Sequence, residues 1–136
     1  GKKPDPIWRD YLVETLGLIK RLSHRPEQLS GGQQQRVAIV RALLSRPDVV
    51  FADEPTGNLD SNSGTEVLKL LRTAATEHQQ TILMVTHSTA AAARAKRVLF
   101  IKDGILYNQI FRGEKTERQM FQEISDTLTV MASEVG

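Results

Sequence analysis

The chain has 136 residues, of which 40% are hydrophobic and 25% are charged, and its net charge is +2. This balance is ordinary for one globular domain, and the absence of cysteine excludes disulfides and thiolate metal sites. No apolar run approaches the roughly 20 residues that span a bilayer, and no basic stripe interleaved with aromatic residues predicts nucleic-acid binding.

The first predicted element is a helix that begins at Asp5-Pro6, a favoured pair for the cap and the first helical position. We expect this helix to end near Gly17 and to bury Trp8 and Tyr11 in the core. Its apolar face, at helical spacing, comprises Ile7, Trp8, Tyr11, Leu12 and Leu16.

A turn with two glycines, Leu29-Ser30-Gly31-Gly32-Gln33, leads into a second helix that we expect to end near Ser45, with Val37, Val40 and Leu44 facing inward. Ser30 and Gln33 have the spacing of a capping box. Gly31 and Gly32 have no side chains to keep an anion from the amides of the first turn, where the helix dipole favours negative charge. The turn predicts a phosphate site, although Ser-Gly-Gly alone is also common in ordinary loops.

Two adjacent carboxylates follow the next element. The apolar run Val49–Asp53 predicts a buried strand, and Glu54 comes directly after it. Ligands of open α/β sheets bind at the carboxyl ends of strands, and successive side chains point to opposite faces. Asp53 and Glu54 are therefore expected to have different roles. The alternative is two solvated acids at the start of a loop.

The remaining elements continue an α/β pattern. After the turn at Pro55–Asn58 we expect a helix over 61–78, with Val67, Leu70, Leu71 and Ala74 on one face, and then a buried strand over 81–86 that leads to His87. His24 and His78 are expected to be ordinary structural residues, with His78 near a helix C-terminus.

The C-terminal third predicts a short helix, a hairpin and a long helix. The short helix covers 89–95, and Asp103-Gly104 is a strong signal for a two-residue hairpin turn between strands 97–102 and 105–111. The final helix, from Thr116 to about Ala132, is amphipathic through Met120, Phe121, Ile124, Leu128 and Met131.

Taken together, these motifs resemble the ATP-binding-cassette (ABC) ATPase family over about residues 5–104. Leu29–Gln33 is similar to its signature motif, Val49–Asp53 to its Walker B strand and Glu54 to its catalytic glutamate. Asn58-Leu59-Asp60 resembles its D-loop, and His87 its switch histidine. These motifs follow one another in the family's order and spacing, which makes the resemblance specific.

The resemblance implies an α/β fold, namely the C-terminal part of a P-loop NTPase (RecA-like) domain. We expect a mostly parallel sheet with flanking helices, followed by a β-hairpin and a helix. Residues 1–46 would form a helical subdomain, 47–111 part of the RecA-like core, and 112–136 the C-terminal helix.

The family's P-loop is missing from these 136 residues, because no G-x-x-x-x-G-K-[ST] sequence occurs. The family's glutamine loop is also absent. With its start at Gly1-Lys2-Lys3, the chain is expected to be a fragment whose nucleotide cradle lies upstream. We expect the isolated chain to bind ATP poorly, to be inactive, and to self-associate through an unpaired strand edge and a bare apolar face.

In the mechanism that the resemblance implies, two copies form a head-to-tail dimer around ATP and Mg²⁺. Ser30, Gly31, Gly32 and Gln33 would contact ATP held by the partner copy, and Asp60 would connect the two sites. Asp53 would help to hold Mg²⁺. Glu54 would activate the attacking water, and His87 would contact the γ-phosphate.

Other partners also follow from the resemblance. A transmembrane permease subunit would bind the ATPase at the cytoplasmic face of the bacterial membrane, and nucleic acid is not expected as a partner. Residues 51–60 resemble the exporter and lipoprotein-releasing branch, and the tail resembles ATPases of bacitracin and antimicrobial-peptide resistance. The alternatives are a soluble ABC ATPase acting on nucleic acid or ribosomes, and a non-catalytic fragment.

Overall fold

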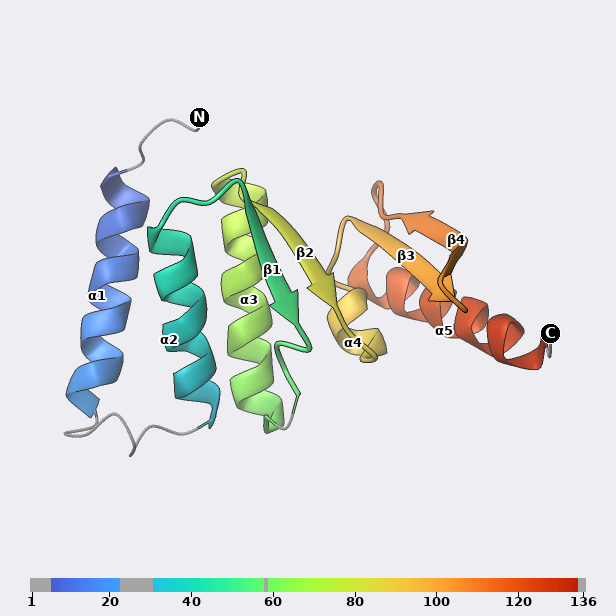
Figure 1. Cartoon of the computed structure of the whole chain (residues 1–136), viewed down its shortest axis with the longest axis horizontal. Coiled ribbons are helices and arrows are strands. Elements are labelled where there is room, and N and C mark those ends of the chain that lie inside the picture. The colour runs from blue at the N-terminus through green and yellow to red at the C-terminus, as the bar shows by residue number, and fades with distance from the viewer. Residues whose placement is uncertain (1–5, 23–30, 58, 135–136) are drawn as a thin grey trace. The chain divides into compact units, whose positions relative to one another are not determined.

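The computed structural model describes residues 6–22, 31–57 and 59–134, which form helices and strands in the order α1-α2-β1-α3-β2-α4-β3-β4-α5 (Figure 1). The chain divides into two compact units, Gly1–Val85 and Thr86–Gly136. The α/β class expected from the sequence is confirmed.

Three helices build most of the first unit: α1 (Pro6–Leu22), α2 (Gly31–Leu44) and α3 (Ser61–Glu77), with α2 between the other two (Figure 1). The predicted bounds of α2 and α3 are correct to within a residue. The predicted stop of α1 at Gly17 is wrong, because the helix continues to Leu22. A Cβ added at Gly17 would meet nothing within 4 Å, and a single glycine lowers helix propensity without ending a helix.

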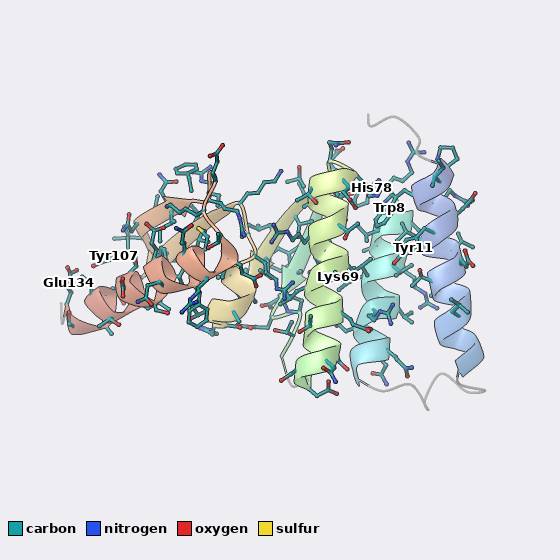
Figure 2. All side chains as sticks on the ribbon, turned by 180° about the vertical axis from the view of Figure 1, so that it is seen from behind. Trp8, Tyr11, Lys69, His78, Tyr107 and Glu134 are labelled. Atoms are coloured by element: carbon teal, nitrogen blue, oxygen red, sulfur yellow. The ribbon has the colours of Figure 1, made fainter. Side chains whose placement is uncertain are left out.

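An aromatic stack joins the start of α1 to the end of α3. Trp8 stacks on His78 with ring centroids 3.8 Å apart, and Tyr11 stacks on Trp8 at 5.5 Å (Figure 2). His78 is the C-cap residue of α3, as expected. Trp8 is partly buried against the core, but Tyr11 is 49% exposed. The prediction that Tyr11 packs in the core is therefore wrong, whereas its neighbour Leu12 is buried at 1% exposure.

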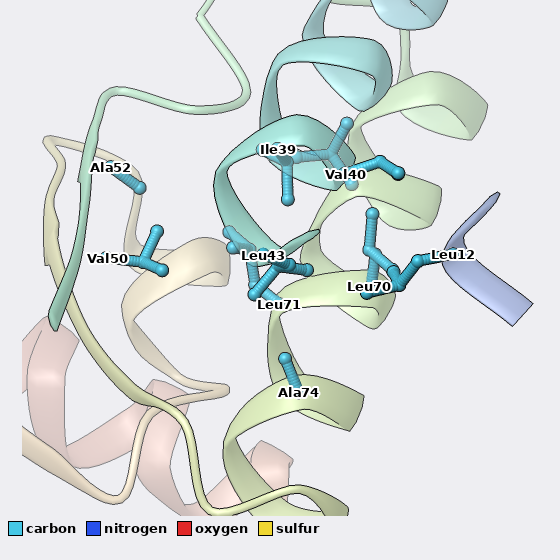
Figure 3. Packing of buried hydrophobic residues seen from close by; sticks show 10 residues of the cluster. Leu12, Ile39, Val40, Leu43, Val50, Ala52, Leu70, Leu71 and Ala74 are labelled. Carbon is cyan, nitrogen blue, oxygen red and sulfur yellow. The ribbon is translucent and has the colours of Figure 1, made fainter. Parts of the chain in front are cut away.

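The main core of the first unit lies between α2, α3 and one face of the first sheet (Figure 3). Val67 and Ala74 are fully buried, and Leu70 and Leu71 are nearly so, which confirms the predicted inner face of α3. On α2 the buried residues are Gly32, Val37, Ile39, Val40 and Leu43. Leu12 of α1 joins the same cluster at 1% exposure.

The first sheet consists of β1 (Val49–Asp53) and β2 (Thr81–Val85), which pair in parallel with Phe51 opposite Leu83 and Asp53 opposite Val85. Val50 and Ala52 face the core. Both strands were predicted to be buried on both faces. The prediction is wrong for the face opposite the core, which is exposed. The side chains of Val49, Phe51, Leu83 and Val85 are 46–62% exposed, because the described helices pack on one face of the sheet only.

This exposed face should make the isolated chain self-associate. We expect dimers or larger species by light scattering, because an apolar face and unpaired strand edges favour pairing with another chain. Phe51→Lys should shift the population towards monomer, whereas Phe121→Lys, at an exposed phenylalanine in the second unit, should not. A monodisperse wild-type monomer would contradict this expectation.

The second unit contains a short helix α4 (Thr89–Ala92), a hairpin of β3 (Arg97–Lys102) and β4 (Ile105–Phe111), and a long helix α5 (Glu117–Ser133). The hairpin bounds agree with the prediction, and Asp103 and Gly104 both have positive φ, as a tight hairpin turn requires. The helix α4 is shorter than predicted, because the amides of Arg94 and Ala95 donate to carbonyls three residues back and tighten the chain into turns.

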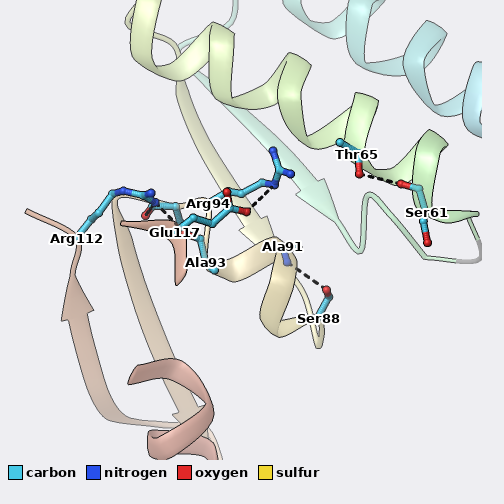
Figure 4. A network of polar contacts seen from close by, with 9 residues as sticks. Ser61, Thr65, Ser88, Ala91, Ala93, Arg94, Arg112 and Glu117 are labelled. Atoms are coloured by element: carbon cyan, nitrogen blue, oxygen red, sulfur yellow. Dashed lines mark hydrogen bonds and ion pairs between the residues drawn. The ribbon is translucent and has the colours of Figure 1, made fainter. Parts of the chain in front are cut away.

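Polar contacts connect the elements of the second unit. Arg112 donates to the carbonyl of Ala93 at 2.8 Å, and Arg94 forms an ion pair with Glu117 at 3.2 Å (Figure 4). Met120 and Ile124 of α5 are buried with Phe100 of β3. Met120 and Ile124 were predicted on the inner face of this helix, whereas Phe121, also placed there, is 44% exposed.

Both ends of α5 have defined contacts. Thr116 and Gln119 form a capping box at its start, and Lys102 of β3 donates to the carbonyls of Met131 and Glu134 at its end. Desolvation, followed by a hydrogen bond with Glu134, raises the pKa of the Tyr107 hydroxyl (both residues labelled in Figure 2). In the part of the chain that the structure describes, no helix has both the length and the apolar character needed to cross a membrane.

Candidate functional site

The two adjacent carboxylates lie where the sequence predicts them, at the carboxyl end of β1. Asp53 is the last residue of the strand and is exposed, whereas Glu54 is half-buried. The amide of Glu54 donates to the carbonyl of Val85 at 2.7 Å, which extends the pairing of the two strands by one residue. The carboxyl edge of this parallel pair therefore carries two acids on a hydrogen-bonded backbone.

The backbone of Glu54 is in the left-handed region, with φ of 46°. A non-glycine residue rarely adopts this conformation, which costs on the order of 1–3 kcal/mol. Neighbouring contacts hold it: Gly57 donates to the Glu54 carbonyl at 2.9 Å, and the next residue, Pro55, is fully buried. A glycine at this position would relieve the strain.

The predicted phosphate turn lies partly outside the described residues, because Leu29 and Ser30 fall in the gap before the description resumes at Gly31. Gly31 begins α2 and is exposed, and Gln33 is half-buried in the same first turn. Gly32 is buried, and a Cβ at this position would lie 2.5 Å from Cβ of Ser63. A side chain at position 31 would therefore fit, whereas one at position 32 would clash with Ser63.

Asp60 is the N-cap of α3. Its carboxylate accepts the amide of Ser63 at 2.8 Å and the hydroxyl of Ser63 at 3.2 Å. The backbone hydrogen bond from Ser63, followed by the one from its side chain, lowers the pKa of Asp60. Sequence reasoning missed this cap, although an aspartate directly before a predicted helix start is a capping signal.

His87 belongs to the second unit and is exposed, two residues beyond the end of β2. Its neighbours define a tight turn, in which the amide of Ser88 donates to the Thr86 hydroxyl at 2.9 Å. Ser88 in turn caps α4 by accepting the amide of Ala91 at 3.1 Å. The histidine thus follows a strand and precedes a capped helix.

The structure brings two sets of predicted residues together within the first unit. Asp53 and Glu54 adjoin each other at the end of β1, and the first turn of α2 contacts the segment of Asp60, since a Cβ at Gly31 would lie 3.5 Å from Leu59. Within 6–22, 31–57 and 59–134, no group of three or more acidic or histidine side chains could hold a metal ion. Asp53 alone still fits Mg²⁺, which often takes one or two carboxylates and completes its shell with substrate phosphates and water.

A family profile described as "ABC transporter" matches residues 7–57. The uncharacterized ABC transporter ATP-binding protein YvcR of Bacillus subtilis (strain 168) is 48% identical over 126 residues, which cover 92% of this chain and 48% of YvcR. The macrolide export ATP-binding/permease protein MacB of Rhodopseudomonas palustris (strain HaA2) is 55% identical over 95 residues, 70% of this chain and 14% of MacB.

Among solved structures, the dimeric post-hydrolysis state of the ATP-binding cassette MJ0796, bound to ADP and Pi, matches with a TM-score of 0.62 at 37% identity. The match covers 82% of this chain and 50% of that cassette. The chain therefore spans about half the length of the full cassettes and ATP-binding proteins that it matches.

Proposed function

Since the chain belongs to the ABC transporter family of ATP-binding domains, we propose that it is part of an ATP-binding and ATP-hydrolysing subunit of a bacterial transporter. The subunit powers export of, or resistance to, a peptide-like or amphipathic substrate. The likeness to MacB, which is named for macrolide export, supports the export branch. The observation that carries the proposal is the Asp53–Glu54 pair at the carboxyl end of a parallel strand.

The two carboxylates have separate tasks in hydrolysis. Glu54 accepts the proton of the attacking water and orients it, and its place directly after the end of β1 supports this role. Asp53 holds Mg²⁺, which supplies charge neutralisation on the phosphates when it is bound. His87 contacts the γ-phosphate and stabilises the charge that develops on it.

The start of α2 serves the nucleotide of a second copy in a homodimer. Ser30, Gly31, Gly32 and Gln33 contact the ATP phosphates with amides at a helix N-terminus, and Asp60 connects the two sites. The dimeric state of MJ0796 with ADP and Pi supports this arrangement. A transmembrane permease binds the dimer at the cytoplasmic face of the membrane, as the combined ATP-binding/permease name of MacB suggests.

A charge at Gly31 tests the dimer. In the full-length protein, Gly31→Asp should weaken ATP-driven dimerisation at least about tenfold, because its carboxylate would face the phosphates of the partner's ATP. The helix should tolerate the change, since an acid in the first turn is favourable and the nearest atom, in Leu59, is 3.5 Å from the added Cβ. Sedimentation with and without ATP measures the effect.

The matched control is Gly31→Asn, which has the same shape without the charge and should dimerise better than the aspartate variant. Binding of ATP to the monomer should be unchanged in both variants. Equal loss of monomer binding, or ATP-driven dimers of normal affinity in Gly31→Asp, would contradict the proposed contact.

A further inference from the structure

The first turn of α2 packs closely against the first turn of α3 where Gly32 meets Ser63, and no side chain would fit at position 32. A Cβ on Gly32 would lie 2.5 Å from Cβ and 2.6 Å from Oγ of Ser63, but 3.6 Å from its Cα. Atoms at the first two distances clash, whereas the third is ordinary contact. Glycine at position 32 is therefore required by the side chain of Ser63.

The same serine donates a hydrogen bond to each oxygen of the Asp60 carboxylate. Its amide donates to Oδ1 at 2.8 Å and its hydroxyl to Oδ2 at 3.2 Å. Ser63 thus lies between two segments that were singled out for nucleotide chemistry, with Gly32 on one side and Asp60 on the other.

A second contact, one helical turn further on, keeps the two helices in this register. Arg36 of α2 forms an ion pair with Glu66 of α3 at 3.1 Å. Gly32 and Arg36 are four residues apart on α2, and Ser63 and Glu66 are three apart on α3, so each pair lies along one helix face. The approach of Gly32 to Ser63 therefore belongs to a continuous seam between α2 and α3.

We propose that Ser63 is a positioning residue: the seam has room for one side chain beside Gly32, and that of Ser63 sets how closely the first turn of α2 approaches the Asp60 cap, so that the turn and Asp60 meet the nucleotides of the dimer as one rigid piece. This inference rests on the proposed function for its nucleotide contacts. The contact between Gly32 and Ser63 stands on the geometry alone.

Two explanations for glycine at position 32 predict different effects of Gly32→Ala when Ser63 is also replaced. If only the phosphate needs the space, Gly32→Ala is damaging whatever residue occupies position 63. If Ser63 needs it, removal of the Ser63 side chain restores function, because the new Cβ then faces Cα at 3.6 Å. Alanine is a better helix former than glycine, so a loss in Gly32→Ala reflects contact and not propensity.

The experiment compares four proteins of full length in the Glu54→Gln background, in which ATP is not consumed: the parent, Gly32→Ala, Gly32→Ala/Ser63→Gly and Gly32→Ala/Ser63→Ala. The ATP concentration for half-maximal dimerisation and the unfolding midpoint are measured for each. Gly32→Ala should need roughly tenfold more ATP, as expected for overpacking. The Ser63→Gly double variant should recover most of this loss, because the new Cβ at position 32 takes the space that the Ser63 side chain leaves and the amide of residue 63 can still cap Asp60. The Ser63→Ala double variant, which keeps the clashing Cβ, should not recover.

Each other outcome overturns the positioning role. A normal Gly32→Ala protein would show that the contact does not constrain the turn. A Ser63→Gly double variant whose unfolding midpoint recovers, but whose dimerisation does not, would assign Gly32 to the phosphate alone. A parent protein without ATP-driven dimers would refute the proposed function as well, and the four unfolding midpoints would still report whether Gly32 and Ser63 are coupled.

Discussion

Replacement of Glu54 by glutamine in the full-length protein should lower ATP hydrolysis by about a hundredfold or more, the usual contribution of a positioned general base. The amide keeps the shape of the side chain and its half-buried position, but it cannot accept a proton from water. ATP binding should remain close to wild type, because the exchange leaves the backbone and the neighbouring Asp53 in place. Phosphate release measures hydrolysis, and calorimetry measures binding.

The matched control for this experiment is Glu77→Gln, which makes the same chemical change at an exposed position at the end of α3. It should leave both hydrolysis and binding unaltered. Turnover near the wild-type rate in Glu54→Gln would remove Glu54 from the role of base. A parallel loss of ATP binding would instead indicate that the glutamate holds the local backbone.

Whether the glutamate holds the local backbone can be measured separately, since the left-handed backbone of Glu54 makes this turn sensitive to the residue at position 54. Glutamine retains the strain, so the Glu54→Gln protein should unfold at the same midpoint as wild type. The hydrogen bonds of Glu54 with Val85 and Gly57 join backbone atoms, which the exchange leaves in place. Chemistry and folding are therefore separable at this residue.

The sequence was sufficient to predict elements with a clear period or turn signal. The inner face of α3 follows from apolar residues at helical spacing, and the hairpin follows from Asp103-Gly104, where both residues have positive φ. The burial of β1 and β2 was not predictable in the same way. A run such as Val49–Asp53 is apolar on both faces, and only the structure reveals that the described helices cover one of them.

The candidate site shows the same division. The position of Asp53 and Glu54 at the end of a strand could be predicted from an apolar run followed by acids. The left-handed backbone of Glu54 could not, because glutamate has no preference for it. The contact between Gly32 and Ser63 could not be predicted either, because the two residues are far apart in the sequence.

Removal of the Leu12 side chain should cause the largest loss of stability in the first unit. Leu12 is 1% exposed and is the buried member of α1 in the core shared by α2 and α3, with Trp8 and Leu16 packed partly against that core. Leu12→Ala should lower the free energy of unfolding by about 2–5 kcal/mol, because the cavity adds to the lost burial of apolar surface. Chemical denaturation measures the change.

The chain offers a local probe for the same experiment, because Trp8 is its only tryptophan and stacks on His78 of the α3 C-cap. We expect tryptophan fluorescence to report the loosening of α1 from α3 in Leu12→Ala at denaturant concentrations where wild type is folded. Leu18→Ala is the control on the same helix, since Leu18 is 53% exposed and surface changes of this kind usually stay within about 0.5 kcal/mol. Equal effects of the two substitutions would mean that α1 does not depend on Leu12 for its place on the core.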